Sequence, residues 1–157
     1  MNIDFKLNGS SCKAEIDPGL LLIDLLREKN CFSVKRGCET ANCGLCTVLL
    51  NGKPILSCST LAARVDGKSV VTLEGMQKEA EEFGAFLADE GAEQCGFCNP
   101  GFVMNVFAML KELNDPSEEQ IKEYLSGNLC RCSGFVSQTL SILKFIEYKK
   151  SQEEVEA

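Results

Sequence analysis

The stretch GCETANCGLCTVLLNGKPILSC, residues 37–58, decides how the first half of the chain folds. Its four cysteines are separated by four, two and eleven residues, at positions Cys38, Cys43, Cys46 and Cys58. This is the plant-type spacing of the ligands of a 2Fe-2S cluster, in which one loop supplies three thiolates and a neighbouring strand supplies the fourth. The alternatives are unligated thiols and a structural zinc site, although zinc loops usually pair cysteines two to four residues apart.

The overall composition limits the chemistry that the chain can perform. Its 157 residues include ten cysteines but no histidine, and the net charge is -7. Without histidine there is no Ser-His or Cys-His pair, so we expect no catalytic residue and no catalysis by the chain alone. The acidic charge argues against nucleic acid as a partner, because phosphates select basic surfaces. We also expect no membrane span and a cytoplasmic, reducing location, because no signal sequence or long apolar run is found.

Alternating apolar residues in the first half predict a small sheet. Ile3, Phe5 and Leu7 alternate with polar residues ahead of Asn8-Gly9, which is typical of a β-hairpin. Leucines at helical spacing predict a helix over 21–29. Strands are expected at 47–50, near 55 and at 70–73. This order predicts a plant-type ferredoxin-like β-grasp domain over residues 1–76.

The second half has the pattern of a helical domain over residues 77–157. We expect helices at 79–90, 100–113, 116–125 and 136–149, arranged as a four-helix bundle, with a frayed tail from residue 151. In the third of these helices, Asp115 is the expected N-cap, Pro116 the first helical residue and Glu118 the third. The predicted fold class is therefore α+β, with the β-grasp domain followed by the helical one.

A second set of cysteines lies in the helical half. Cys95 and Cys98 are two residues apart, and one residue separates Cys130 from Cys132. Both pairs lie near the expected start of a helix, where the helix dipole stabilises anionic thiolates. This spacing alone fits a four-cysteine zinc site almost as well as an iron-sulfur cluster.

Two longer motifs resemble a known family. QCGFCNPGF at 94–102 and SGNLCRCSGF at 126–135 are similar to the iron-sulfur subunit of the molybdenum hydroxylases, the xanthine dehydrogenase family. The resemblance extends over nearly the whole chain and implies two 2Fe-2S clusters. It also implies two partners: a large molybdopterin-binding subunit that holds the molybdenum cofactor, and a medium FAD-binding subunit.

The resemblance further implies an order of electron flow and a role for individual residues. Electrons would pass from the molybdopterin centre through both clusters to FAD. By this resemblance, Cys95, Cys98, Cys130 and Cys132 hold the cluster nearer molybdenum, and Cys38, Cys43, Cys46 and Cys58 hold the one nearer FAD. Gln94 and Cys132 match positions that approach the pterin in relatives.

The leading functional hypothesis is therefore an electron-transfer subunit of a molybdenum-containing hydroxylase. One alternative is a free-standing ferredoxin-like carrier whose helical domain is stabilised by zinc, and another is a redox-sensing adaptor. The substrate lies beyond this chain, and purines, N-heterocycles, aldehydes, aromatic thioesters and carbon monoxide all remain candidates. The two remaining cysteines, Cys12 and Cys31, are interpreted as structural thiols of the apolar core.

Overall fold

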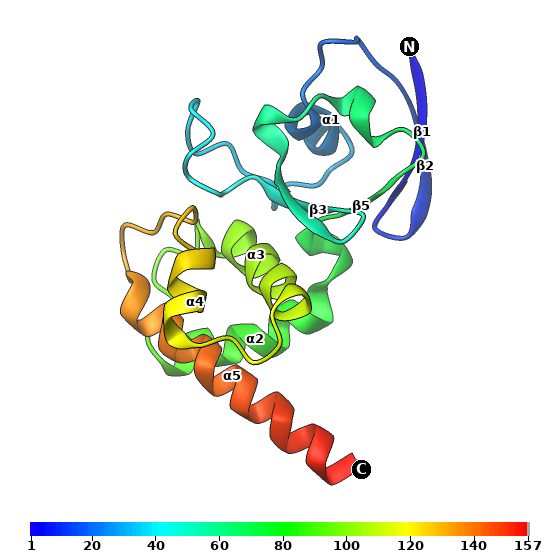
Figure 1. Cartoon of the computed structure of the whole chain (residues 1–157). Helices are drawn as coiled ribbons and strands as arrows, with labels where there is room; N and C mark the ends of the chain where they lie inside the picture. The colour runs from blue at the N-terminus through cyan, green and yellow to red at the C-terminus, as the bar shows by residue number, and fades with distance from the viewer. Residues whose placement is uncertain (157) are drawn as a thin grey trace.

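The computed structural model describes residues 1–156 and has an α+β fold. A mixed five-stranded sheet and a helix form the N-terminal part, and four helices form the C-terminal part (Figure 1). The strand order is β2-β1-β5-β3-β4, in which only the pair β1 and β5 is parallel. The strands are β1 (Asn2–Leu7), β2 (Ser10–Glu15), β3 (Thr47–Leu50), β4 (Lys53–Leu56) and β5 (Ser69–Val71).

Two tight hairpins set the register of the sheet. Asn8 and Gly9 join β1 to β2 with φ angles of 51° and 83°, and Asn51 and Gly52 join β3 to β4 with φ angles of 49° and 82°. Asn-Gly pairs suit such turns because both residues tolerate positive φ, and the turn follows the twist of the strands. The hairpins predicted from these Asn-Gly pairs are therefore confirmed.

Helix α1 (Leu22–Glu28) supplies the apolar residues that cover the sheet. Leu22 and Leu26 are fully buried and share a core with Phe5 and Val48 from the strands. Cys31 is buried in this core and Cys12 is partly buried against it. Three short 3₁₀ helices follow the strands: η1 (Ser57–Ser59), η2 (Ala62–Val65) and η3 (Leu73–Gly75).

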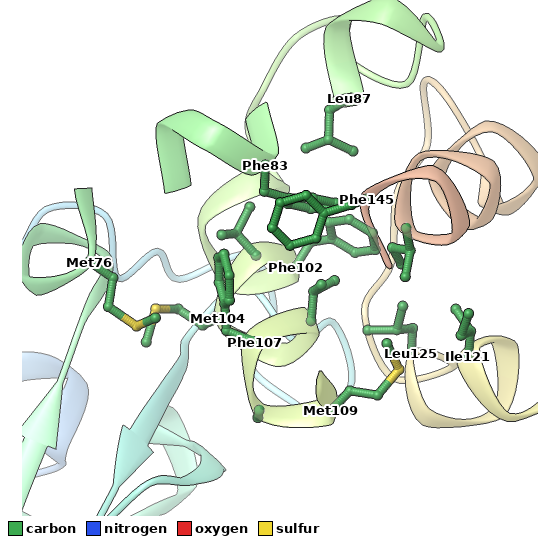
Figure 2. Packing of buried hydrophobic residues seen from close by; sticks show 14 of the residues in the cluster. Met76, Phe83, Leu87, Phe102, Met104, Phe107, Met109, Ile121, Leu125 and Phe145 are labelled. Atoms are coloured by element: carbon green, nitrogen blue, oxygen red, sulfur yellow. The ribbon is translucent and has the colours of Figure 1, made fainter. Parts of the chain in front are cut away.

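The helical part is built around aromatic side chains, which Figure 2 shows at close range. Phe83 contacts Phe145 with ring centroids 5.2 Å apart and Phe102 with centroids 6.3 Å apart. Phe107 meets Phe145 edge to face at 6.2 Å. The helices are α2 (Gln77–Asp89), α3 (Asn99–Glu112), α4 (Glu118–Tyr124) and α5 (Phe135–Glu156). Their arrangement as a regular four-helix bundle stays a prediction.

The apolar core of the helical part continues to the sheet. Helix α3 packs against β3, and Leu49 of β3 and Met76 belong to the same core as the aromatic residues. Met76 and Met104 approach each other where the two parts meet (Figure 2). The sheet and the helices therefore share buried surface. Within residues 1–156, no helix combines the length and the apolar character that crossing a membrane requires.

Two details of the helical prediction were wrong. Helix α4 starts at Glu118 rather than Pro116, because Ser117 is its N-cap: the Ser117 side chain accepts from the Gln120 N–H, and the Gln120 side chain accepts from the Ser117 N–H. This reciprocal pair satisfies two backbone donors. Helix α5 continues to Glu156 instead of ending at 149, and the expected frayed tail is helical as far as the structure describes it. Position 157 of that tail lies outside the described residues.

Candidate iron-sulfur centres

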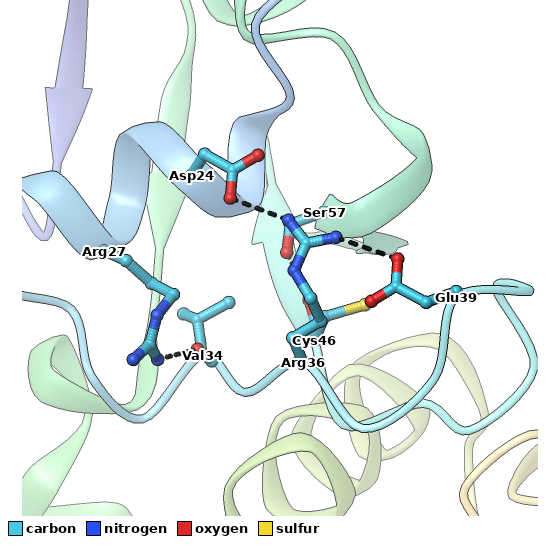
Figure 3. Close-up of polar contacts among 7 residues, drawn as sticks. All are labelled: Asp24, Arg27, Val34, Arg36, Glu39, Cys46 and Ser57. Atoms are coloured by element: carbon cyan, nitrogen blue, oxygen red, sulfur yellow. Dashed lines mark hydrogen bonds and ion pairs between the residues drawn. The ribbon is translucent and has the colours of Figure 1, made fainter.

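The first cysteine set, called the loop set, consists of Cys38, Cys43, Cys46 and Cys58. Its first three members lie on the segment between α1 and β3, and Cys58 lies in η1 directly after β4. The β3–β4 hairpin brings η1 back beside Cys46, where the Cys46 carbonyl accepts bonds from the Ser57 N–H at 3.2 Å and from the Ser57 hydroxyl at 2.8 Å (Figure 3). Pairing of β3 with β4 therefore places the fourth thiol, Cys58, beside Cys46.

Salt bridges and hydrogen bonds fix the approach of the chain to this loop. The Arg36 guanidinium lies 2.7 Å from a carboxylate oxygen of Asp24 on α1 and 3.5 Å from one of Glu39. Arg27 donates to the Val34 carbonyl at 2.9 Å (Figure 3). Both arginines therefore tie the cysteine loop to the preceding helix.

The thiols of the loop set differ in their ease of ionisation. Backbone N–H groups of Thr40, Asn42 and Cys43 lower the pKa of the Cys38 thiol to about 6, and the Asn42 nitrogen lies 3.4 Å from its sulfur. Burial and contact with Cys46 raise the pKa of Cys58 to about 12. Cysteine binds metal as its thiolate, and hydrogen bonds from the backbone alone favour the thiolate form of Cys38.

The second set, called the helical set, consists of Cys95, Cys98, Cys130 and Cys132. Cys95 and Cys98 lie on the connection between α2 and α3, and the other two lie between α4 and α5. The sulfurs of Cys95 and Cys132 are 3.5 Å apart. Cys98 is the N-cap residue of α3, which begins at Asn99, one residue before the expected start at 100.

The helical set repeats the ionisation pattern of the loop set. Burial disfavours the Cys130 thiolate, but N–H groups of Gly134, Ser133 and Cys132 outweigh it and lower the pKa to about 7. The Ser133 nitrogen lies 3.4 Å from the Cys130 sulfur. Burial and contact with Cys130 raise the pKa of Cys98 to about 11. The connection that leads into α5 at Phe135 therefore provides the donors that stabilise a thiolate.

The thiols lie in pairs, which fits a cluster with two metal ions. The sulfurs of Cys95 and Cys132 are 3.5 Å apart, and in the other pairs one thiol affects the pKa of its neighbour: Cys38 with Cys43, Cys46 with Cys58, and Cys98 with Cys130. In a 2Fe-2S cluster, four thiolates serve two irons, and N–H donors to sulfur are a usual feature of such sites. The donor sets fit a binuclear cluster at each site.

Hydrogen bonds join a segment of the loop set to a segment of the helical set, a contact that no sequence pattern predicted. The Leu129 N–H donates to the Cys43 carbonyl at 3.0 Å, and Leu129 precedes Cys130 in the chain. The neighbouring Asn128 is 5% exposed and donates to the Gly44 carbonyl at 3.3 Å. Asn105 of α3 donates to the Asn128 side chain at 2.6 Å. One backbone bond therefore links a segment of the loop set to a segment of the helical set.

A glycine makes this junction possible. A Cβ atom at Gly101 of α3 would lie 2.2 Å from the Gly44 carbonyl oxygen, closer than any side chain tolerates. Glycine is required wherever two backbones approach this closely. Gly101 directly follows Asn99-Pro100, and a glycine inside the first turn of a helix was the one sequence signal that could have indicated the contact.

The proposed pterin contacts lie at the surface of the helical set. Gln94 and Cys132 are both exposed, and the Cys132 sulfur contacts Cys95. Exposed apolar side chains lie near them in the chain, at Phe97, Leu129, Phe135, Val136 and Leu140. Val136 is 73% exposed. This face is therefore suited to contact with another protein.

Comparison with known proteins agrees with this geometry. Residues 9–82 match the family described as a 2Fe-2S iron-sulfur cluster binding domain, and residues 72–143 match the 2Fe-2S binding domain. The chain is 39% identical to the nicotinate dehydrogenase small FeS subunit of Eubacterium barkeri, covering 87% of this chain and 88% of that one. It is 42% identical to the xanthine dehydrogenase iron-sulfur-binding subunit of Escherichia coli O157:H7, with coverage of 86% and 87%.

The chain belongs to the iron-sulfur small subunits of the molybdenum hydroxylase family. Solved structures agree with this membership. A chain of quinoline 2-oxidoreductase from Pseudomonas putida 86 is 37% identical, with a TM-score of 0.83 and 90% of each chain covered. The aldehyde oxidoreductase of Desulfovibrio gigas is 33% identical with the same TM-score; 90% of this small subunit corresponds to 16% of that longer chain.

Proposed function

We propose that this small subunit carries electrons from a molybdopterin-binding large subunit to an FAD-binding medium subunit. The observation that carries the proposal is that the segments bearing the two four-thiol sets lie in contact. The N–H of Leu129, which precedes Cys130, donates to the Cys43 carbonyl at 3.0 Å. When bound, each 2Fe-2S cluster supplies one-electron redox chemistry. Short, packed connections between such centres favour electron transfer over release of the electron to solvent.

The residues of the two sets have separate roles in this proposal. Cys38, Cys43, Cys46 and Cys58 hold the cluster nearer FAD, and Cys95, Cys98, Cys130 and Cys132 hold the cluster nearer molybdenum. The greater exposure of Cys95 and Cys132, together with the exposed apolar side chains near them in the chain, supports contact of the helical set with the large subunit. Gln94 and Cys132 are proposed to approach the pterin there.

The proposal includes the organisation and location of the chain. A division into domains 1–76 and 77–157 is supported by the start of α2 at Gln77. All ten cysteines are free thiols, which supports a reducing, cytoplasmic location. The chain alone turns over no substrate, because its thiolate-saturated metals offer no open coordination position. The alternative is a free-standing carrier in which the helical set holds zinc.

Metal analysis of the full chain tests the proposal against this alternative. After anaerobic reconstitution, we expect four iron and four acid-labile sulfide per chain, and two distinct 2Fe-2S signals by electron paramagnetic resonance after reduction. Two iron with one zinc would favour the zinc-stabilised carrier and reject the two-cluster function.

Assembly with the partner subunits tests the proposed interface. We expect Val136→Asp to weaken association with the large subunit at least tenfold, because it places a charge at the most exposed of these apolar side chains. Lys78→Met on α2 changes the net charge equally at an exposed position and should leave assembly unchanged. If both variants were retained equally in the complex, the interface with the large subunit would have to lie elsewhere on the chain.

A further inference from the structure

Phe97 lies between two cysteines of the helical set, Cys95 and Cys98. Its carbonyl and the Cys98 N–H belong to one peptide group, which stands directly beside the Cys98 thiol. A charge that polarises this peptide therefore acts next to a proposed ligand of the helical set.

Lys35 places such a charge on Phe97. Its ammonium nitrogen donates to the Phe97 carbonyl oxygen at 3.2 Å and lies 4.7 Å from the centre of the Phe97 ring. Lys35 precedes Cys38 by three residues, and its own backbone N–H donates to the Leu45 carbonyl at 3.4 Å. A residue that is close to the loop set in sequence thus places its charge beside the helical set.

The neighbouring arginine shows that this direction is particular to Lys35. The Arg36 guanidinium pairs with Asp24 and Glu39 beside the loop set, where the carboxylates offset its charge. The Lys35 ammonium instead pairs with a neutral carbonyl and an aromatic ring, which leave its positive charge intact. Cation–π contact adds to the hydrogen bond and holds the ammonium in place.

A fixed cation at this position favours additional negative charge on the helical set. A 2Fe-2S cluster gains one electron on reduction, and its potential depends on net charge and on hydrogen bonds to sulfur. The ammonium attracts the added electron directly. It also polarises the Phe97–Cys98 peptide, which strengthens the Cys98 N–H as a donor to sulfur. Both effects stabilise the reduced form more than the oxidised form.

We propose that Lys35 is a positioning residue that raises the reduction potential of the cluster in the helical set from the opposite part of the molecule. The inference rests on the proposed function, since it requires clusters at both sets. The contact between Lys35 and Phe97 depends on the packing of the sheet against the helices. This packing would therefore influence the reduction potential of the helical-set cluster. The cation acts by its own charge and through the Phe97–Cys98 peptide, and it is not itself a metal ligand.

Redox titration of the reconstituted full chain, followed by electron paramagnetic resonance, tests this role. We expect Lys35→Met to lower the midpoint potential of the helical-set cluster, so that its reduced-to-oxidised ratio at a fixed solution potential falls about tenfold. The loop-set cluster should shift less. Lys35→Arg keeps the charge and should restore most of the potential. Lys78→Met makes the same change in net charge at an exposed site on α2 and should shift neither cluster.

Each signal is assigned with Cys98→Ser, which removes a ligand of the helical set only. An unchanged helical-set potential in Lys35→Met, or a shift confined to the loop-set cluster, would overturn the inference. Iron and sulfide content separates this failure from failure of the proposed function: four iron per chain with unchanged potentials rejects only the role of Lys35, whereas two iron with one zinc rejects the function.

The wild-type chain provides a second test that does not depend on folding of the variant. Salt screens a partly exposed charge, so raising the ionic strength should lower the potential of the helical-set cluster more than that of the loop-set cluster. Equal salt responses of the two clusters would contradict an electrostatic role for Lys35.

Discussion

Each of the two cysteine sets brings four thiols together, but the parts of the fold that supply the thiols differ. In the loop set, Cys43 and Cys46 are buried, and a strand hairpin brings in the fourth thiol. In the helical set, Cys95 and Cys132 are exposed, and two interhelical connections supply the thiols in pairs. The sheet and its long loop bury two of their thiols, whereas the interhelical connections leave two of theirs at the surface. The open set is therefore the better suited to receive electrons from a neighbouring subunit.

The chemical similarity of the two sets lies in the backbone. In each set, N–H groups lower the pKa of one thiol, to about 6 for Cys38 and about 7 for Cys130. In each set, burial raises the pKa of another thiol, to about 12 for Cys58 and about 11 for Cys98. Each set therefore combines one thiol that ionises readily with one that would release its proton to solvent only on binding metal.

The largest expected effect comes from removing one cysteine ligand from one set at a time. Cys98→Ser should lose the helical-set cluster, and Cys46→Ser should lose the loop-set cluster, each reducing iron from four to about two per chain, because serine is a poor ligand for these clusters. Loss of all four irons in either variant would show that the two sets do not fill independently. Iron and sulfide analysis measures the outcome, and Cys12→Ser is the control.

The next largest effect tests the junction between the two parts. Gly101→Ala places a Cβ 2.2 Å from the Gly44 carbonyl oxygen, so we expect a loss of about 3 kcal/mol in the free energy of unfolding, measured by urea denaturation. Gly84→Ala in α2 meets no atom within 4 Å and should stabilise the chain by about 0.5–1 kcal/mol. Equal stability of the two variants would mean that the sheet and the helices are not held as closely as described.

A smaller effect compares the thiols of the two sets after the clusters are removed. At pH 7.5, we expect iodoacetamide to modify Cys38 and Cys130 about tenfold faster than Cys58 and Cys98, because the thiolate is the reacting form. The pKa values of about 6 and 7 place the first two in that form at this pH. Mass spectrometry at short reaction times gives the order. In urea the difference should disappear, and its persistence there would exclude the folded backbone as its cause.

The smallest expected effect concerns a carboxylate near the link between the two parts. Burial disfavours the charge of Glu74, but hydrogen bonds from Ser33 and Thr72 outweigh it and lower the pKa below the ordinary value of 4.5. Because the folded pKa is the lower one, ionised Glu74 stabilises the fold above pH 4.5, and this contribution is lost as the pH falls through the folded pKa. Glu74→Gln should therefore flatten the acid side of the stability profile.

Urea unfolding between pH 3 and pH 7 measures this difference. Glu79→Gln, at an exposed position on α2, serves as the control and should keep the wild-type profile. If the free energy of unfolding of wild type and Glu74→Gln changed identically with pH, ionised Glu74 would not stabilise the folded chain.

Much of the local structure followed from short-range signals. The two Asn-Gly pairs determined both hairpins because few residues tolerate positive φ. Cysteine spacing determined which thiols could share a cluster, because a loop of four residues can wrap metals only in a few ways. The ends of α4 and α5 were less certain: Ser117 competed with Asp115 as a cap, and only the structure shows α5 continuing beyond Lys149.

The sequence by itself determined the fold class, the two cysteine sets and the family, since these depend on local periodicity and on the spacing of chemically distinctive residues. Only the tertiary structure decided how the sets meet. The bond from Leu129 to Cys43 joins residues 86 positions apart, and the contact of Lys35 with Phe97 joins residues 62 positions apart. No local pattern encodes such pairs, because they depend on how α3 docks on β3 and on the close backbone approach that Gly101 allows.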